Sequence, residues 1–446
     1  MNLKRLWFWS ITVALGGFLF GFDTAVISGA EQTIQRMWGL SSVQHGFTVS
    51  IALIGTVFGA LFGGIPSDRL GRKKTLFWIA VFYLISAVGS ALATDWYIFM
   101  FFRFLGGLGV GASSVAAPMY ISEIAPPESR GKLVAMFQFN IVFGILIAYL
   151  SNYLIGGSGE NAWRWMLGVE AFPALIFLVL VLFVPESPRW LILKRKDVSQ
   201  ARSVLAQIDP ERADEEVREI QNTTLAKEIK TESLFSKRYS TPVKLAILFA
   251  VFNQLSGINA IIYYAPRVLE MTGLATSSAL LSSAGIGLVN FMATLLALSV
   301  IDKMGRRKLM LIGSFGLILT LGLVSRAFFT QSFGIWVPIY LFVYIAFFAF
   351  SQGAVIWVFI SEIFPNRIRA SGQALGSFTH WIMAAVIAFV FPIFTEALGG
   401  GFTFAIFSVM MILQLLFVWK MMPETKGKSL EELELNLSYE TSMTKD

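Results

Sequence analysis

The stretch Gly16–Ala30 reads GGFLFGFDTAVISGA, and it places a carboxylate within an apolar segment. The residues from Leu6 to Phe22 are almost wholly apolar and are long enough to enter a bilayer. A carboxylate at the end of such a run is costly in hydrocarbon, so it needs a partner, a proton or a water-filled cavity. We therefore predict a functional role for Asp23. The alternative is that Asp23 lies at the outer water interface.

Depth along two predicted helices favours the functional interpretation. A helix that enters the bilayer near Trp7 places Asp23 about 24 Å along its axis, still inside a hydrocarbon core of about 30 Å. In the segment DWYIFMFFRFLGGLGVGAS, a helix that enters from the other side near Trp96 places Arg103 about 10 Å deep. Asp23 and Arg103 are thus predicted to lie at similar depth on different helices and to pair.

The composition indicates a membrane protein with many spans. Of the 446 residues, 56% are hydrophobic and only 14% are charged, which is too apolar for a soluble chain. We predict an all-α fold with twelve transmembrane helices, at 7–30, 44–66, 75–93, 96–120, 132–155, 164–184, 242–268, 277–300, 308–329, 335–360, 370–395 and 401–422. The lipid bilayer is therefore an expected partner.

The net charge of +7 reflects orientation rather than binding to nucleic acid. All but five of the 35 lysines and arginines fall in termini and loops on one predicted side; the exceptions are Arg36, Arg103, Arg164, Arg267 and Arg326. This asymmetry puts both termini and the long loop 185–241 in the cytoplasm. With no cysteine and only two histidines, disulfides and thiolate or multi-histidine metal sites are excluded. We expect no metal and no cofactor.

Three segments recur in the same order at offsets between 234 and 239 residues. They are Asp68–Lys74 with Asp302–Lys308, Ser122–Pro126 with Ser361–Pro365, and, more loosely, Pro185–Arg189 with Pro423–Gly427. An even number of helices per copy gives both copies the same orientation, so we predict two parallel six-helix repeats. The expected domains are a bundle at 1–190, a linker at 191–241, a bundle at 242–430 and a tail at 431–446. The linker's apolar residues suit short amphipathic helices, with a solvated linker as the alternative.

Charged residues at the paired loops suggest a cytoplasmic network. We expect ion pairs between the halves when the inner side is closed, and the alternative is anchoring of positive charge alone. The residues concerned are Asp68, Arg72, Glu123, Arg130, Glu186, Arg189, Asp302, Arg306, Glu362, Arg369 and Glu424.

The second half opens with FNQLSGINAIIYYAP, which contains a predicted helix break at Gly257. Broken helices at membrane depth are tolerated only around cavities. Gln254 lies five residues before Asn259, so the break is needed to bring the two amides together. Asn259 and Tyr263 share a face at a spacing of four residues. The position that corresponds to Asp23 in the second repeat falls within this same segment. Polar, interrupted segments at corresponding positions of both halves indicate a binding site near the bilayer midplane.

These motifs resemble the sugar porter family of the major facilitator superfamily over residues 12–435. The shared motifs are GGFLFGFDTAVISGA, DRLGRKK, RFLGGLGVG, PMYISEIAPPESRGK, PESPRWL, QLSGINAIIYYAP, DKMGRRK, SEIFPNRIR and PETKG. The chain is most similar to bacterial proton-coupled monosaccharide symporters of the xylose and glucose type. The resemblance implies that Asp23 accepts the proton and that Arg103 is its counter-ion. Facilitative animal carriers have asparagine at the position of Asp23, which favours symport.

The resemblance also implies a sugar site and an outer gate. Substrate-binding residues would be Gln138, Asn253, Gln254, Asn259, Tyr263, Asn290, Trp357, His380 and Trp381, and gating residues would be Tyr264 and Gly257. Three positions depart from the family pattern: Asn253 replaces glutamine, Gln352 replaces tryptophan and His380 replaces an amide. We expect His380 to tune which sugar fits; alternatively it titrates and contributes to coupling, or packs away from the cavity.

Together these features predict a transporter that takes up a monosaccharide with a proton by alternating access. The alternatives are a facilitative sugar uniporter or a sugar sensor without transport on the same fold. No catalytic arrangement is visible, so we do not expect an enzyme. We expect a monomer in a bacterial inner (plasma) membrane.

Overall fold

The computed structural model describes residues 2–225, 233–365, 368–428 and 432–433. Within these ranges the regular elements are helices, and eleven of them are long and apolar enough to cross a membrane. The chain divides into two compact units. Unit 1 comprises Met1–Ala30, Ile51–Ser151 and Ser158–Lys230, and unit 2 comprises Glu31–Ser50, Asn152–Gly157 and Thr231–Asp446.

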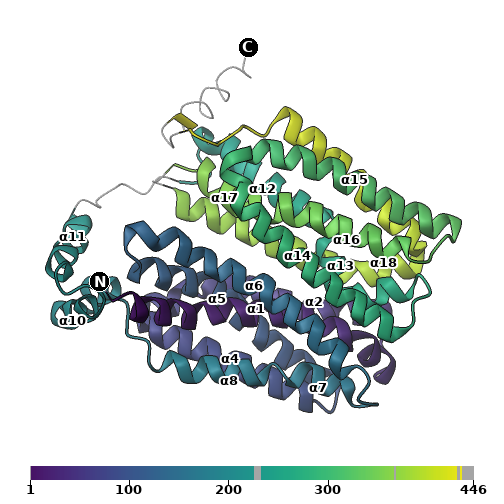
Figure 1. The fold of residues 1–446 in the computed structure, drawn as a ribbon, viewed down its shortest axis with the longest axis horizontal. Helices are drawn as coiled ribbons and strands as arrows, with labels where there is room; N and C mark the ends of the chain where they lie inside the picture. The colour runs from purple at the N-terminus through teal and green to yellow at the C-terminus, as the bar shows by residue number, and fades with distance from the viewer. Residues whose placement is uncertain (1, 226–232, 366–367, 429–431, 434–446) are drawn as a thin grey trace. The chain divides into compact units, whose positions relative to one another are not determined.

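Unit 1 holds most of the helices of the first repeat (Figure 1). Its elements are α1 (Leu3–Met37), α2 (Ser42–Phe62), α3 (Gly64–Leu70), α4 (Arg72–Leu92), α5 (Trp96–Ile124), α6 (Pro127–Ile155), α7 (Ala162–Gly168), α8 (Ala171–Val181), α9 (Pro188–Trp190), η1 (Leu191–Arg195), α10 (Val198–Ile208) and α11 (Ala213–Leu225). The end of α1, the start of α2 and the end of α6 belong to unit 2. Helix α4 packs against α5, α7 and α8.

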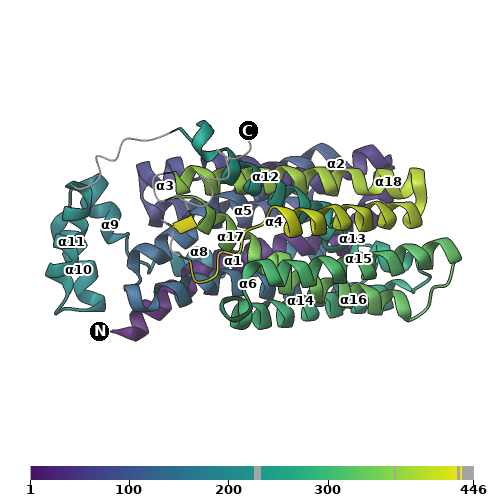
Figure 2. The same cartoon turned by 90° about the horizontal axis from the view of Figure 1, so that it is seen from above.

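Unit 2 contains η2 (Lys237–Tyr239), α12 (Ser240–Leu255), α13 (Ile258–Glu270), α14 (Thr276–Met304), α15 (Arg306–Thr330), α16 (Trp336–Phe348), η3 (Ala349–Gly353), α17 (Ala354–Ile363) and α18 (Arg369–Lys420). Helices α14, α15 and α16 run alongside one another (Figures 1 and 2). Apolar side chains of α12, α14, α15, α17 and α18 form its core, in which the rings of Phe249 and Phe359 stack with centroids 5.3 Å apart.

The longest element, α18, explains why eleven membrane helices carry twelve predicted spans. It is 52 residues long, but Gly399 has a φ of 76° and a ψ of 166°, which no α-helix accommodates. The break separates the predicted spans 370–395 and 401–422. Only glycine adopts a positive φ without steric cost, so the sequence itself supplies the turn.

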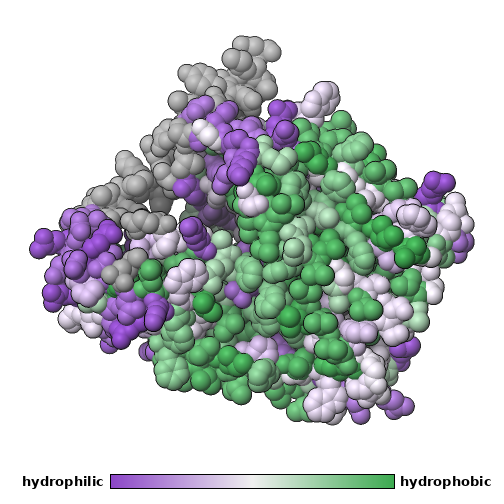
Figure 3. Space-filling model, in the orientation of Figure 1, coloured by the Kyte–Doolittle hydropathy of each residue, from purple (hydrophilic) through white to green (hydrophobic). Residues whose placement is uncertain are grey.

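The linker between the repeats contains the short helices α10 and α11. Their apolar positions Val204, Leu205, Ile208 and Val217 are buried, which confirms the amphipathic pattern. Asp197 caps α10 by accepting a hydrogen bond from the backbone N–H of Gln200 at 3.0 Å, and this bond lowers the pKa of Asp197. Hydrophilic residues gather on these helices, whereas hydrophobic residues cover much of the remaining visible face (Figure 3).

Glycines allow α1 and α6 to approach very closely within unit 1. A Cβ atom at Gly21 of α1 would overlap the backbone of Ile141, and a Cβ at Gly144 of α6 would overlap the backbone of Phe18. Such small residues are typical of helix crossings in membranes, where close backbone contact provides packing energy. The crossing holds the segment of α1 that carries Asp23.

Replacing Gly21 with alanine should therefore destabilise the protein. The added methyl group must push α1 away from the α6 backbone, and overpacking of this kind costs about 1–3 kcal/mol. We expect the melting temperature in detergent to fall by several degrees. Gly131→Ala is the matched control, because a Cβ atom there meets nothing within 4 Å. An equal loss of stability in both variants would contradict the packing role of Gly21.

Candidate functional site

The predicted pair of Asp23 and Arg103 is present in unit 1. Arg103 Nη1 of α5 donates to Asp23 Oδ1 of α1 at 2.5 Å, and Nη2 donates to the Asp23 backbone oxygen at 3.4 Å. Both side chains are buried, with 2% and 4% of their surface exposed. A buried charge requires compensation of this kind, so the guanidinium stabilises the carboxylate at this position.

A second carboxylate, which is not among the predicted site residues, adjoins this pair. Glu170 lies between α7 and α8, is 2% exposed, and interacts electrostatically with both Asp23 and Arg103. Its Oε1 atom is buried without a hydrogen-bond partner among the described residues. The sequence did contain a signal, because a glutamate within the predicted span 164–184 is expensive in a bilayer and therefore noteworthy.

The predicted helix break occurs in unit 2. Helix α12 ends at Leu255, Gly257 adopts a φ of 82°, and α13 begins at Ile258. The turn brings Asn259 Nδ2 within 2.6 Å of Gln254 Oε1, to which it donates a hydrogen bond. A continuous helix would separate these amides around its axis, so the break creates their contact.

Gln254 lies at the centre of a buried polar cluster. Its Nε2 atom donates to Asn253 Oδ1 at 3.0 Å and lies 3.2 and 3.3 Å from the two ring nitrogens of His380 on α18. Asn253, Gln254 and Asn259 are each at most 8% exposed. The cluster therefore presents amide and imidazole groups that can both donate and accept hydrogen bonds.

Two indole rings enclose His380. The centroids of Trp357 and His380 are 4.9 Å apart, and those of His380 and Trp381 are 4.8 Å apart in an edge-to-face arrangement. Next to them, the π-helical segment η3 carries Gln352, whose backbone oxygen accepts a hydrogen bond from Asn253 Nδ2 at 3.5 Å. Short π-helical segments are often found at functional sites.

The remaining predicted site residues lie on three helices. Tyr263 and Tyr264 are buried on α13. The Tyr264 hydroxyl donates a hydrogen bond to the Ala388 backbone oxygen at 2.8 Å. The backbone φ of Tyr264 is −124°, which interrupts the helix. Asn290 is 8% exposed on α14 of unit 2. Gln138 is partly buried on α6 of unit 1. Its place in a sugar site stays a prediction.

The charged residues of the repeated loops form matching clusters within each unit. In unit 1, Arg72 donates to Glu123 at 2.8 and 2.9 Å and to Asp68 at 3.1 Å. The Ser187 hydroxyl also donates to Glu123 at 2.5 Å. Glu186 accepts hydrogen bonds from the backbone N–H groups of Arg72 and Lys73.

The same arrangement recurs in unit 2. Arg306 donates to Glu362 at 2.7 and 3.1 Å and to Asp302 at 2.9 Å. The Thr425 hydroxyl donates to Glu362 at 2.6 Å, and Glu424 accepts from the backbone N–H groups of Arg306 and Arg307. The duplication predicted from the sequence is therefore visible in individual hydrogen bonds.

The described ion pairs of the charged loops are formed within each unit. Ion pairs between the halves when the inner side is closed stay a prediction. Arg130 and Arg369 donate to the backbone oxygens of Ala125 and Phe364 rather than to carboxylates, and Arg189 is exposed. Backbone carbonyls at a nearby helix end compete well for a guanidinium, which spacing along the sequence does not reveal.

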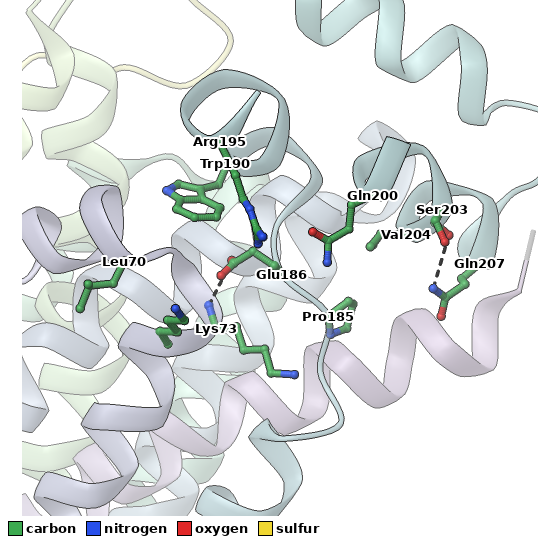
Figure 4. A pocket seen from close by; sticks show the side chains of 11 residues that line it. Leu70, Lys73, Pro185, Glu186, Trp190, Arg195, Gln200, Ser203, Val204 and Gln207 are labelled. Carbon is green, nitrogen blue, oxygen red and sulfur yellow. Dashed lines mark hydrogen bonds between the residues drawn. The ribbon is translucent and has the colours of Figure 1, made fainter. Parts of the chain in front are cut away.

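A cavity of about 360 Å³ lies beside the unit 1 cluster (Figure 4). Lys73, Pro185, Glu186, Trp190 and Gln200 are among the residues that line it, and none of the predicted sugar-binding residues does. Burial raises the pKa of Glu186, although the backbone N–H groups of Ser187, Lys73 and Arg72 oppose this effect. The cavity therefore belongs to the charged loops and not to the amide cluster.

Comparison with known proteins gives concordant matches over nearly the whole chain. The family model described as "Sugar (and other) transporter" matches residues 9–437. The D-xylose-proton symporter of Escherichia coli K12 is 38% identical and aligns over 98% of this chain and 96% of its own. The arabinose-proton symporter of Bacillus subtilis is also 38% identical, with coverages of 95% and 93%.

Solved structures agree with the sequence matches. The inward-open xylose transporter XylE from E. coli has a TM-score of 0.86 at 37% identity and covers 96% of this chain and 98% of its own. XylE bound to 6-bromo-6-deoxy-D-glucose, described as a major facilitator superfamily symporter, has a TM-score of 0.79 at the same identity, with coverages of 98% and 100%. These matches confirm the predicted resemblance and the predicted all-helical fold class.

The two loop clusters predict unequal effects of equivalent substitutions. Arg72→Gln leaves Glu123 without its cation, and the Glu123 side chain is only 10% exposed, so the expected loss is about 3 kcal/mol. Arg306→Gln should cost less, because its partner Glu362 is 24% exposed and water can solvate it better. Melting temperatures in detergent measure both effects, with the exposed Lys74→Gln as control. A larger loss for Arg306→Gln would contradict this assignment.

Proposed function

Because the chain belongs to the sugar transporter family, we propose that it takes up a monosaccharide together with a proton by alternating access. The buried group of Asp23, Arg103 and Glu170 is the observation that carries this proposal. Relatives named as proton symporters of xylose and arabinose support it. The family and these relatives are transporters, which agrees with the expectation that the chain is not an enzyme.

The charges of the unit 1 group support a proton site. Glu170 and Asp23 are two buried carboxyl groups that interact electrostatically, and two like charges in one buried site are unfavourable unless one of them binds a proton. Arg103 then balances the remaining negative charge. One proton can therefore bind and leave here while Arg103 limits the net charge in the membrane to zero or minus one.

The polar cluster of unit 2 supports a site for a neutral, hydroxyl-rich ligand. Gln254, Asn259 and His380 offer donors and acceptors at close spacing, and they satisfy one another when no ligand is bound. Sugar hydroxyls can replace these internal bonds one for one. Trp357 and Trp381 add apolar ring faces, which suit the C–H surface of a pyranose.

Several finer expectations accompany this proposal. The lysine and arginine asymmetry favours cytoplasmic termini in a bacterial inner membrane, and we expect a monomer in the bilayer. The domain division at 190, 241 and 430 and the role of Gln138 in sugar binding remain predictions. The uniporter and sensor alternatives are distinguished by transport measurements, because only a symporter accumulates sugar when a proton gradient is imposed.

Asp23→Asn should abolish proton-driven accumulation of sugar in proteoliposomes. Asparagine keeps the size and a hydrogen-bond acceptor for Arg103 but cannot exchange a proton, so sugar should only equilibrate. Exchange of labelled for unlabelled sugar should remain detectable. Asp214→Asn, on exposed α11, is the control and should accumulate sugar like the parent. Undiminished uphill uptake by Asp23→Asn would rule out the proposed coupling, and no uphill uptake by the parent would favour the uniporter or the sensor.

His380→Gln should change the ranking of sugars while leaving proton-driven uptake intact. Glutamine also offers both a donor and an acceptor but has no ring, so hydroxyls that relied on the imidazole lose or gain about 1–3 kcal/mol, or roughly five- to a hundred-fold in affinity. Uptake competition across hexoses and pentoses gives the ranking, with the exposed Gln373→Ala on the same helix as control. An unchanged ranking with lost proton dependence would instead make His380 a coupling residue.

A further inference from the structure

A second buried cluster of charged groups lies in unit 2, at the end of α1 that follows Asp23. Glu31 of α1 and His45 of α2 have fully buried side chains, and Arg267 of α13 has a side chain that is 21% exposed. Nothing in the sequence motifs or in the proposed transport mechanism uses these residues. Such a cluster in a membrane protein requires an explanation, because each charge is costly to bury.

Hydrogen bonds occupy both oxygens of the Glu31 carboxylate. Arg267 Nε donates to Oε1 at 2.9 Å, and Arg267 Nη2 donates to Oε2 at 2.6 Å. His45 Nε2 also lies 2.6 Å from Oε2. Arg267 Nη2 makes a further bond of 2.6 Å to Gln35 Oε1, again on α1. Arg267 therefore links α13 to the end of α1 by hydrogen bonds to Glu31 and Gln35.

Arg267 supplies the positive charge that balances the buried Glu31 carboxylate. When His45 is neutral, the charges of Glu31 and Arg267 cancel. Binding of one more proton to this cluster would leave a buried positive charge without a counter-ion. His45 Nδ1 is buried and has no partner among the described residues to accept that proton. If Arg267 leaves, the Glu31–His45 pair carries one buried negative charge, and one proton restores neutrality.

The neighbouring titratable groups cannot replace Arg267. Tyr264 and Glu270 of α13 interact electrostatically with Arg267, but neither is a cation. Glu270 accepts a hydrogen bond from Gln32 of α1 at 2.9 Å, and Glu396 of α18 accepts one from Ser42 at the start of α2. These carboxylates therefore have neutral partners and supply no positive charge to Glu31.

Helix α13 has the backbone features of a movable element. It begins directly after the positive φ of Gly257 and is interrupted again at Tyr264. It also carries Asn259 of the polar cluster, so its position is connected to ligand binding. Hinges are commonly a few residues at the ends of such elements.

We propose that Glu31 and His45 form a second proton-binding site, which Arg267 occupies in the conformation seen here. When α13 moves away, the pair takes up one proton; when α13 returns, the guanidinium displaces that proton. Because the proton binds only the undocked state, acidification raises the undocked population by up to tenfold per pH unit. The proposal rests on the proposed proton-coupled transport, but its test needs neither sugar nor a gradient.

The absence of cysteine from the chain permits a direct test by spin labelling. We would introduce Val43→Cys and Ala275→Cys, both at exposed positions and outside the cluster, and measure the label distances in lipid nanodiscs from pH 8 to pH 5. The population with the longer distance should grow on acidification. In Glu31→Gln/Arg267→Gln, which removes both charges and keeps hydrogen bonding, this pH response should vanish.

Two further variants separate this site from Asp23 and from a folding defect. Asp23→Asn should retain the pH response. His45→Gln keeps the Glu31–Arg267 pair, and its response should shift to lower pH because an amide binds no proton. The proposal fails if the parent distances do not change with pH, if the double variant responds like the parent, if Asp23→Asn abolishes the response, or if His45→Gln leaves its midpoint unmoved. Loss of uphill transport in the parent would refute the proposed function but would not alter these distances.

Discussion

The cost of placing a charge in hydrocarbon is the constraint on which this structure depends. Asp23 satisfies it with Arg103 across two helices of unit 1, and Glu31 satisfies it with Arg267 across two helices of unit 2. A buried ion pair contributes little net stability, since desolvation opposes the attraction between the charges, but the loss of one partner is severe. If two helices move so that an arginine leaves its carboxylate, the carboxylate needs a proton to stay neutral. The position of the helices and the protonation of these carboxylates are therefore linked.

The duplicated loop clusters also pair their buried charges, but their side chains are less deeply buried than those of Asp23 and Arg103. Arg72 and Arg306 contact their glutamates with nearly the same distances, and a hydroxyl completes each cluster, from Ser187 in one case and from Thr425 in the other. Because each cluster is complete within its own unit, it stabilises the ends of the helices that it joins. The repeated sequence is thus explained by a local structural need.

Much of this arrangement could be predicted from the sequence. Hydropathy located the spans, depth along two helices paired Asp23 with Arg103, and Gly257 predicted the contact between Gln254 and Asn259. Spacing along the sequence does not assign partners where several acids and bases are near each other, as in the clusters around Arg72 and Arg306. Glu170 was missed although its position in an apolar span is visible, and Arg267 was recognised as an exception to the charge asymmetry without its partner Glu31 being identified. In each case the missing information is which helices are neighbours, and only tertiary packing supplies it.

The π-helical segment η3 has a consequence for how this chain tolerates insertions and deletions. A π-turn contains one residue more than an α-turn, and each residue of a helix advances by about 100° around its axis. Loss of one residue from Ala349–Gly353 would convert the segment to regular α-helix without breaking it. All of α17 would then rotate by about a quarter turn relative to α16, and Trp357 would face away from His380. A length change that leaves the helix intact would thus remodel the wall of the polar cluster, so natural variation in the length of this segment is a route to new ligand preferences.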